Sequence, residues 1–204
     1  MSAIDKLVSA ITPPVSEEKR EKAHARARAE ALPGGWLSLI LDQHEAIAQE
    51  FSEVRAAPEA RTRRLAERRL ATLLNGHAMA EEAVVYPALA QVHETGHAHK
   101  AYTEQAAAKM QLAALETIDP MSEDYLDKLG HLESAIMHHV FEEESDWLLE
   151  LQTRATTHEN ERITIRFREE FDRYMGPEAP DYRAGPIHVA SEPRAFTVDR
   201  PSPG

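Results

Sequence analysis

The chain has 204 residues, of which 42% are hydrophobic and 28% are charged, a balance typical of globular proteins. Its 35 acidic and 23 basic side chains give a formal net charge of −12, which argues against nucleic acid or an anionic membrane as the main partner. Cysteine is absent, which excludes disulfides, thiolate metal sites, iron–sulfur clusters and cysteine nucleophiles.

Residues 1–34 are predicted to form a helical extension, with a short helix over residues 3–11 and a longer one over residues 17–32. The longer helix is too polar to belong to a hydrophobic core. This region lacks the pattern of a secretory signal, and no apolar run in the sequence reaches the roughly 18 residues that a membrane span needs. We therefore expect a cytoplasmic protein.

Residues 35–152 are predicted to form an up-down antiparallel four-helix bundle, which makes the fold class all-α. Apolar residues recur there with the spacing of helices that bury one face, and no strand alternation competes with them. The short connections favour antiparallel neighbours. Pro87 should bend or end the second helix, because proline breaks the helical hydrogen-bond pattern. The expected helices cover residues 36–55, 60–91, 98–117 and 122–151.

Two further segments are expected after the bundle. Residues 153–175 should add a C-terminal helix at about 157–174, and residues 176–204 should form an extended tail. Half of the twelve prolines lie between Pro177 and Pro203, so this tail cannot be helical for long. Apolar residues such as Ile187 and Phe196 favour its partial docking on the body of the protein.

Histidines and glutamates interrupt the apolar faces of three predicted helices. His44 lies on the first, His77 and Glu81 on the second, and His139 and Glu143 on the fourth. A pair spaced i, i+4 shares one helical face, and a buried ionised glutamate needs a cation or a proton. Each residue alone is compatible with a hydrogen-bonded core position, but three converging helices predict a metal centre.

The chemistry of these side chains narrows the choice of metal. Imidazoles and carboxylates without thiols suit iron, manganese or zinc. Two carboxylates that can act as bridges suit a two-metal centre.

The pattern resembles the hemerythrin family, in particular the bacterial hemerythrin-like (HHE cation-binding) domains. The resemblance covers residues 36–152. It is carried by Leu41-Asp42-Gln43-His44-Glu45, by the string from His77 through Glu81-Glu82 to Tyr86-Pro87, and by His138-His139-Val140-Phe141-Glu142-Glu143-Glu144 before Trp147. It implies an up-down four-helix bundle around a non-haem di-iron centre. By position, His44, His77 and His139 would be terminal ligands, and Glu81 and Glu143 would be bridging carboxylates.

The third helix departs from the family pattern. The family supplies a histidine there, whereas this chain has Gln105, a poor iron ligand beside imidazole. Tyr102, one turn earlier, is the expected substitute, with water as another option. His97 and His99 are further candidates if the helix begins early; otherwise they form, with His93, a solvated loop cluster.

Two more histidines are expected near the metal rather than on it. His131 should line the bundle, and His138 should face away from the centre. A shift by one residue, which would exchange the pair His139 and Glu143 for His138 and Glu142, stays open.

Open coordination positions on such a centre would take dioxygen, peroxide or nitric oxide, or the protein would handle iron. Gln105 weakens the hypothesis of a reversible oxygen carrier. A peroxide- or nitric oxide-reactive oxidoreductase stays open, whereas no hydrolase or transferase motif is present. The alternative is a helical scaffold or interaction protein with a degenerate or structural metal site, whose N-terminal helix and tail could pack on a second subunit to make a homodimer.

Overall fold

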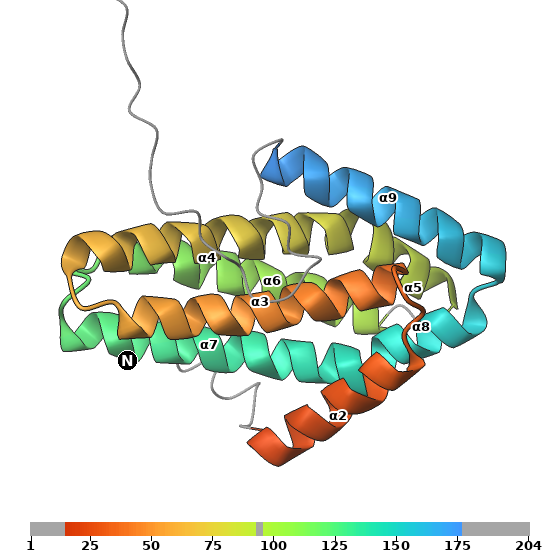
Figure 1. The fold of residues 1–204 in the computed structure, drawn as a ribbon, viewed down its shortest axis with the longest axis horizontal. Coiled ribbons are helices and arrows are strands. Elements are labelled where there is room, and N and C mark those ends of the chain that lie inside the picture. Colours follow the sequence, from red (N-terminus) through yellow and green to blue (C-terminus); the bar gives the residue numbers. More distant parts are fainter. Residues whose placement is uncertain (1–14, 93–95, 177–204) are drawn as a thin grey trace, which may run out of the picture.

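The computed structural model describes residues 15–92 and 96–176, and over these ranges every regular element is a helix (Figure 1). The expected all-α class is confirmed. The helix predicted over residues 3–11 and the tail from residue 177 onward lie outside the described residues. None of the described helices has the length and hydropathy that crossing a membrane would require.

Four long helices form an up-down bundle, as the sequence predicts (Figure 1). Helix α3 packs on α4 and α7, and α6 packs on the same two helices, so the four make a closed ring. Their apolar faces meet in a core that includes the fully buried Leu37, Ile40, Leu70 and Leu129. Burial of each such side chain contributes roughly 1.5–3 kcal/mol. The bounds are α3 Trp36–Ala56, α4 Ala60–Ala80, α6 Gly96–Leu115 and α7 Glu123–Glu142.

Two of these helices continue through π-helical turns, which a regular 3.6-residue periodicity does not predict. In each turn an amide donates to the carbonyl five residues earlier: Tyr86 to Glu81 in the first and Leu148 to Glu143 in the second. A π turn holds one extra residue, so side chains five apart come to share a face. The elements are η1 Glu81–Val85 followed by α5 Tyr86–Val92, and η2 Glu143–Trp147 followed by α8 Leu148–Arg154.

Pro87 is the second residue after η1, and its position explains how the turn is stabilised. Proline has no N–H, so the carbonyl of Glu82, five residues earlier, has no amide partner in the π pattern. The Tyr102 hydroxyl of α6 donates to this carbonyl at 2.8 Å. Its ring also packs edge-on against Tyr86, with ring centroids 5.3 Å apart. A side chain of α6 therefore replaces the missing backbone bond.

Two helices pack on the outside of the bundle. Helix α9, Thr157–Met175, lies against α3 and α4 and buries Ile163, Phe167 and Phe171 (Figure 1). Helix α2, Glu17–Glu30, crosses the bundle obliquely and contacts α3, α7 and η2. Only alanines of α2 are buried, which agrees with the prediction that this helix is too polar for a core element. Both helices pack on the bundle of their own chain.

Candidate metal centre

The five predicted ligands converge at one end of the bundle, and each is at most 5% exposed. His44 comes from α3 and His77 from α4, whereas Glu81 and Glu143 are the first residues of η1 and η2. Ligand atoms of these four residues all lie within 4.8 Å of one another. His139 of α7 adjoins them, with Nε2 3.4 Å from Glu143 Oε1.

Three buried atoms of this cluster accept or donate no hydrogen bond within the described part of the chain. They are His44 Nε2, Glu81 Oε1 and Glu143 Oε2. Leaving buried polar atoms without partners is costly, so such a group calls for an explanation. A cation provides one, and the imidazole and carboxylate donors fit iron, manganese or zinc.

Each imidazole of the centre is oriented by an acceptor on its far nitrogen. This arrangement is typical of metal-bound histidines, because it fixes the tautomer and leaves Nε2 free for the ion. The contacts are His44 Nδ1 to Glu144 Oε1 at 2.8 Å, His77 Nδ1 to Gln43 Oε1 at 2.9 Å, and His139 Nδ1 to Glu104 Oε2 at 3.0 Å.

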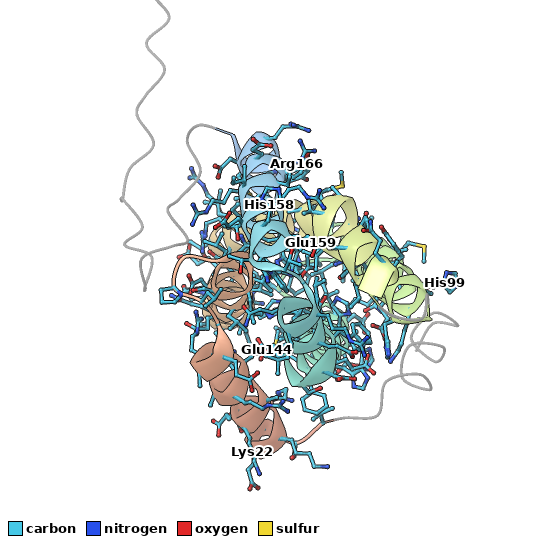
Figure 2. The ribbon with its side chains drawn as sticks, turned by 90° about the vertical axis from the view of Figure 1, so that its right-hand side faces the viewer. Lys22, His99, Glu144, His158, Glu159 and Arg166 are labelled. Carbon is cyan, nitrogen blue, oxygen red and sulfur yellow. The ribbon has the colours of Figure 1, made fainter. Side chains whose placement is uncertain are left out.

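The acceptor behind His44 also binds helix α2. Glu144, labelled in Figure 2, comes from η2. It is 2% exposed and accepts a second hydrogen bond, at 3.0 Å, from His24. His24 Nε2 lies 2.9 Å from Glu45, which pairs in turn with Arg28. Although burial opposes it, hydrogen bonding to the two imidazoles lowers the pKa of Glu144 to about 2. A charged carboxylate therefore connects the centre to α2.

We expect Glu144→Gln to weaken metal binding about 10- to 100-fold, the usual cost of removing an acceptor behind a metal-bound histidine. Competition with a chromophoric chelator measures this. Glu142→Gln is the matched control, because Glu142 pairs with Lys100 instead of a predicted ligand. Equal affinities in the two variants would contradict this role of Glu144.

A tyrosine lies at the middle of the cluster. Tyr86 is fully buried, and its hydroxyl is 3.0 Å from Glu143 Oε1 and 3.1 Å from both Glu81 Oε2 and His139 Nε2. Gln105 Nε2 donates to the same hydroxyl at 2.6 Å and to Glu81 Oε2 at 2.8 Å. Gln105 therefore does face the centre, as its position in the sequence predicts, but through its amide nitrogen.

The role of Tyr86 was missed because ordinary helical periodicity places it on another face from Glu81. Residues five apart are about 140° apart around an α-helix, and the π turn η1 brings them back together. The proline at position 87 was the available signal, since it removes a backbone donor at the point where the helix changes its winding.

Proton binding is strongly perturbed in the metal-free cluster. Burial opposes protonation of His44, but the neighbouring carboxylates of Glu143 and Glu144 raise its pKa to about 10. Burial and the positive charge of His44 lower the pKa of His77 well below its usual value. Burial and the charge of Glu143 raise the pKa of Glu81 to about 8. At neutral pH, His44 and Glu81 therefore carry protons that a metal ion would have to displace.

Comparison with known proteins identifies this fold and its cluster. The family model "Hemerythrin HHE cation binding domain" matches residues 37–151, more than half of the chain. The chain belongs to the hemerythrin HHE cation-binding family. This membership confirms the sequence resemblance and supports non-haem metal binding, for which the described His and Glu cluster provides candidate ligands.

Other comparisons with this hemerythrin-family chain are more limited. A DNA nickase of Nostoc sp. (strain PCC 7120 / SAG 25.82 / UTEX 2576) is 28% identical over 95 residues, which cover 47% of this chain. The match spans 27% of the length of that nickase. No solved structure matches significantly.

Three residues proposed as extra ligands lie away from the hemerythrin centre. Tyr102, expected as a substitute ligand, is 38% exposed, and its hydroxyl donates to the Glu82 carbonyl instead of facing the cluster. Helix α6 begins early, at Gly96, so His97 and His99 are helical rather than part of a loop. His97 packs 5.2 Å from the Trp147 ring, and His99 is exposed (Figure 2). His93 lies outside the described residues.

The two histidines expected near the metal also take defined positions in the hemerythrin bundle. His138 faces Glu142 at 3.6 Å, in a group with Glu104 where Lys100 already supplies a cation. The one-residue ambiguity is thus resolved in favour of His139 and Glu143 as the pair that faces the centre. His131 is half-buried two turns before His139, about 12 Å along the helix.

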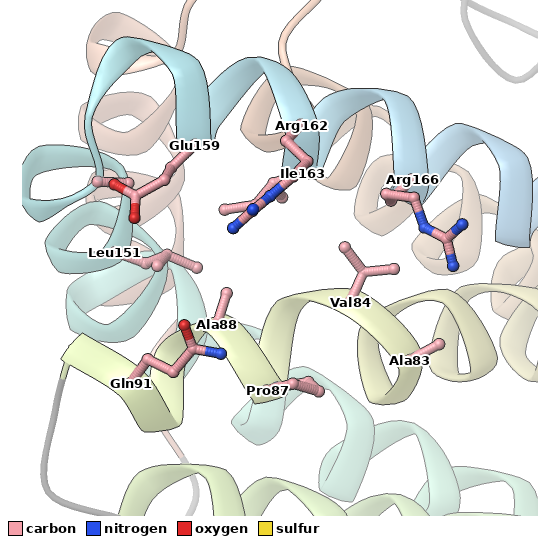
Figure 3. A pocket seen from close by; sticks show the side chains of 11 residues that line it. Ala83, Val84, Pro87, Ala88, Gln91, Leu151, Glu159, Arg162, Ile163 and Arg166 are labelled. Carbon is pink, nitrogen blue, oxygen red and sulfur yellow. The ribbon is translucent and has the colours of Figure 1, made fainter.

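Two pockets lie near the hemerythrin centre. A cavity of about 30 Å³ touches His77, Gln105 and His139, and its other walls are mainly apolar, including Leu112 and Ile136. A larger pocket of about 270 Å³ lies between α9 and the outer face of η1 and α5 (Figure 3). No histidine lines this larger pocket, so it is not part of the centre.

Proposed function

We propose that the protein holds iron in this centre and binds or senses a small molecule such as dioxygen, peroxide or nitric oxide, or handles the iron itself. One observation carries the proposal: the unpartnered atoms of His44, Glu81 and Glu143 are buried together beside His77. The small cavity beside His77 supports the small-molecule role, because its volume of about 30 Å³ exceeds the roughly 10–15 Å³ that a molecule the size of water needs.

The residues of the chain have separate roles in this proposal. His44 and His77 would bind through Nε2, held in orientation by Glu144 and Gln43. Glu81 and Glu143 would balance the charge of the ion. Iron, when bound, would supply a redox-active centre with a coordination position for an exogenous ligand. The apolar walls of the cavity would exclude bulk water and larger ligands.

The activity of the nickase relative is not transferred to this chain. The matched segment is 27% of that protein, and the net charge of −12 disfavours contact with DNA phosphates. The alternative function is a helical scaffold with a degenerate metal site, and the experiment below distinguishes it from the proposed iron-binding function.

The test is elemental analysis of protein grown with iron, followed by anaerobic titration with nitric oxide and an optical spectrum. We expect stoichiometric iron and a spectral change that saturates with nitric oxide. Zinc-loaded protein is the control, because it fills the site without redox chemistry. Protein that binds no metal would favour the scaffold. Iron-loaded protein whose spectrum does not change with nitric oxide, peroxide or dioxygen would restrict the proposed role to iron handling.

Filling the cavity should slow ligand entry without changing the metal content. Ala108 lines the cavity on α6, so Ala108→Leu places three more carbon atoms in it. We expect association of nitric oxide to slow at least about tenfold, since interiors leave little room for relaxation. Stopped-flow absorbance measures this, with Ala106→Leu on the exposed face of α6 as control. Equal rates in both variants would show that ligands enter elsewhere.

A further inference from the structure

Each of the two central carboxylates has one engaged and one free oxygen. The free atoms are Glu81 Oε1 and Glu143 Oε2, and the nearest imidazole nitrogen to the latter, His44 Nε2 at 3.4 Å, is also without a hydrogen bond. The engaged atoms, Glu81 Oε2 and Glu143 Oε1, both contact the Tyr86 hydroxyl. The two carboxylates therefore have one side that faces the Tyr86 hydroxyl and one side whose oxygens have no hydrogen-bond partner among the described residues; on the Tyr86 side, Gln105 Oε1 is also without one.

The engaged side is organised around a single oxygen atom. Two carboxylate oxygens, the Nε2 of His139 and the amide nitrogen of Gln105 surround the Tyr86 hydroxyl at 2.6 to 3.1 Å. Two carboxylates and an imidazole are a donor set suited to a metal ion. Here a hydroxyl, with one proton to donate and two lone pairs to accept, takes the position of that ion.

The surrounding structure holds Tyr86 in this position. The side chain is fully buried, it follows the π turn η1 that directs it inward, and the Tyr102 ring packs against its edge. Gln105 donates to both the hydroxyl and Glu81, so it fixes the two relative to each other. A histidine at position 105 could bind an ion, whereas Gln105 donates a hydrogen bond to the Tyr86 hydroxyl.

We propose that the Tyr86 hydroxyl fills the second metal position, held by Gln105, so that the chain binds a single ion at His44, His77, Glu81 and Glu143. This inference rests on the proposed function and replaces the two-metal centre that the sequence led us to expect. Tyr86 and Gln105 are positioning residues: they keep the two carboxylates apart from a second ion and direct their free oxygens toward the first.

The first test needs no variant. Iron-loaded wild-type protein should contain one iron per chain and, when oxidised, give the electron paramagnetic resonance signal of an isolated high-spin ferric ion. Two irons per chain in a spin-coupled pair would overturn the inference, and a visible phenolate band lost in Tyr86→Phe would identify Tyr86 as a ligand instead. Protein without bound iron would refute the proposed function itself, so the two failures are distinguishable.

A second test opens the occupied position. The double variant Tyr86→Phe/Gln105→His removes the hydroxyl, keeps the ring and adds an imidazole beside His139. Zinc or iron content should rise from one to two ions per chain. Tyr174→Phe, which changes an exposed phenol on α9, should stay at one. A folded double variant, checked by circular dichroism, that still binds one ion would show that this side is not a metal position.

Discussion

Glu81→Ala should abolish stoichiometric metal binding and lower the stability of the metal-loaded protein at the same time. Glu81 is fully buried, and its two oxygens face both sides of the centre. Without it, a bound ion would lose a charged ligand and Glu143 would be left as the sole central carboxylate. A ligand present at 100 times its dissociation constant stabilises the folded state by about 2.7 kcal/mol, and this contribution should disappear.

Elemental analysis and urea unfolding with and without added metal measure the two effects. Glu82→Ala is the matched control, because the neighbouring carboxylate pairs with Lys109 at a half-exposed position outside the cluster. The control should keep its metal and its metal-dependent stability. Unchanged metal content in Glu81→Ala would refute the assignment of the centre.

Metal binding should release protons and strengthen with rising pH. The pKa of His44 in the metal-free cluster is raised to about 10, so its imidazole is protonated at pH 7, and an ion must displace that proton to reach Nε2. Affinity should rise about tenfold per pH unit for each proton displaced, up to about pH 10. Calorimetric titrations in buffers of different ionisation enthalpy count the protons. An affinity that does not change between pH 7 and pH 9 would contradict this model of the cluster.

The same shifts set the stability of the metal-free protein. Because the pKa of His44 is raised from 6.5 to about 10, its contribution is complete below pH 6.5 and is lost as the pH rises toward 10. The pKa of Glu81 is raised from 4.5 to about 8, so its contribution is lost over that lower interval. Metal-free protein should therefore lose stability at alkaline pH, and added metal should restore it most strongly there.

Much of the fold and of the centre could be predicted from the sequence, because both depend on the regular spacing of side chains along α-helices. The bundle helices begin and end close to their predicted boundaries, and His77 with Glu81 and His139 with Glu143 meet because side chains four apart share a helical face. His44 joins them because it lies in the apolar stripe of α3. The class of metal ligand follows from these side chains alone.

The features that the sequence pattern does not predict depend on a local change of helical winding or on contacts between residues far apart in the sequence. Tyr86 reaches the centre through a π turn, which no 3.6-residue period reveals. Tyr102 lies one turn from Gln105, yet its hydroxyl goes to a carbonyl that Pro87 leaves without an amide partner. His24 meets Glu144 across 120 positions of the chain, a contact that local periodicity cannot predict.

The contact between His24 and Glu144 means that residues supporting the proposed metal centre extend beyond the range matched by the family model. The family match begins at residue 37, whereas the imidazole that holds the far side of Glu144 belongs to α2. A shortened chain that starts with the bundle would expose Glu144 to water and loosen the carboxylate that orients His44 from behind. Detachment of α2 would therefore disturb the orientation of His44, a predicted metal ligand, through the side chain of Glu144. This connects the polar helix to the proposed metal centre.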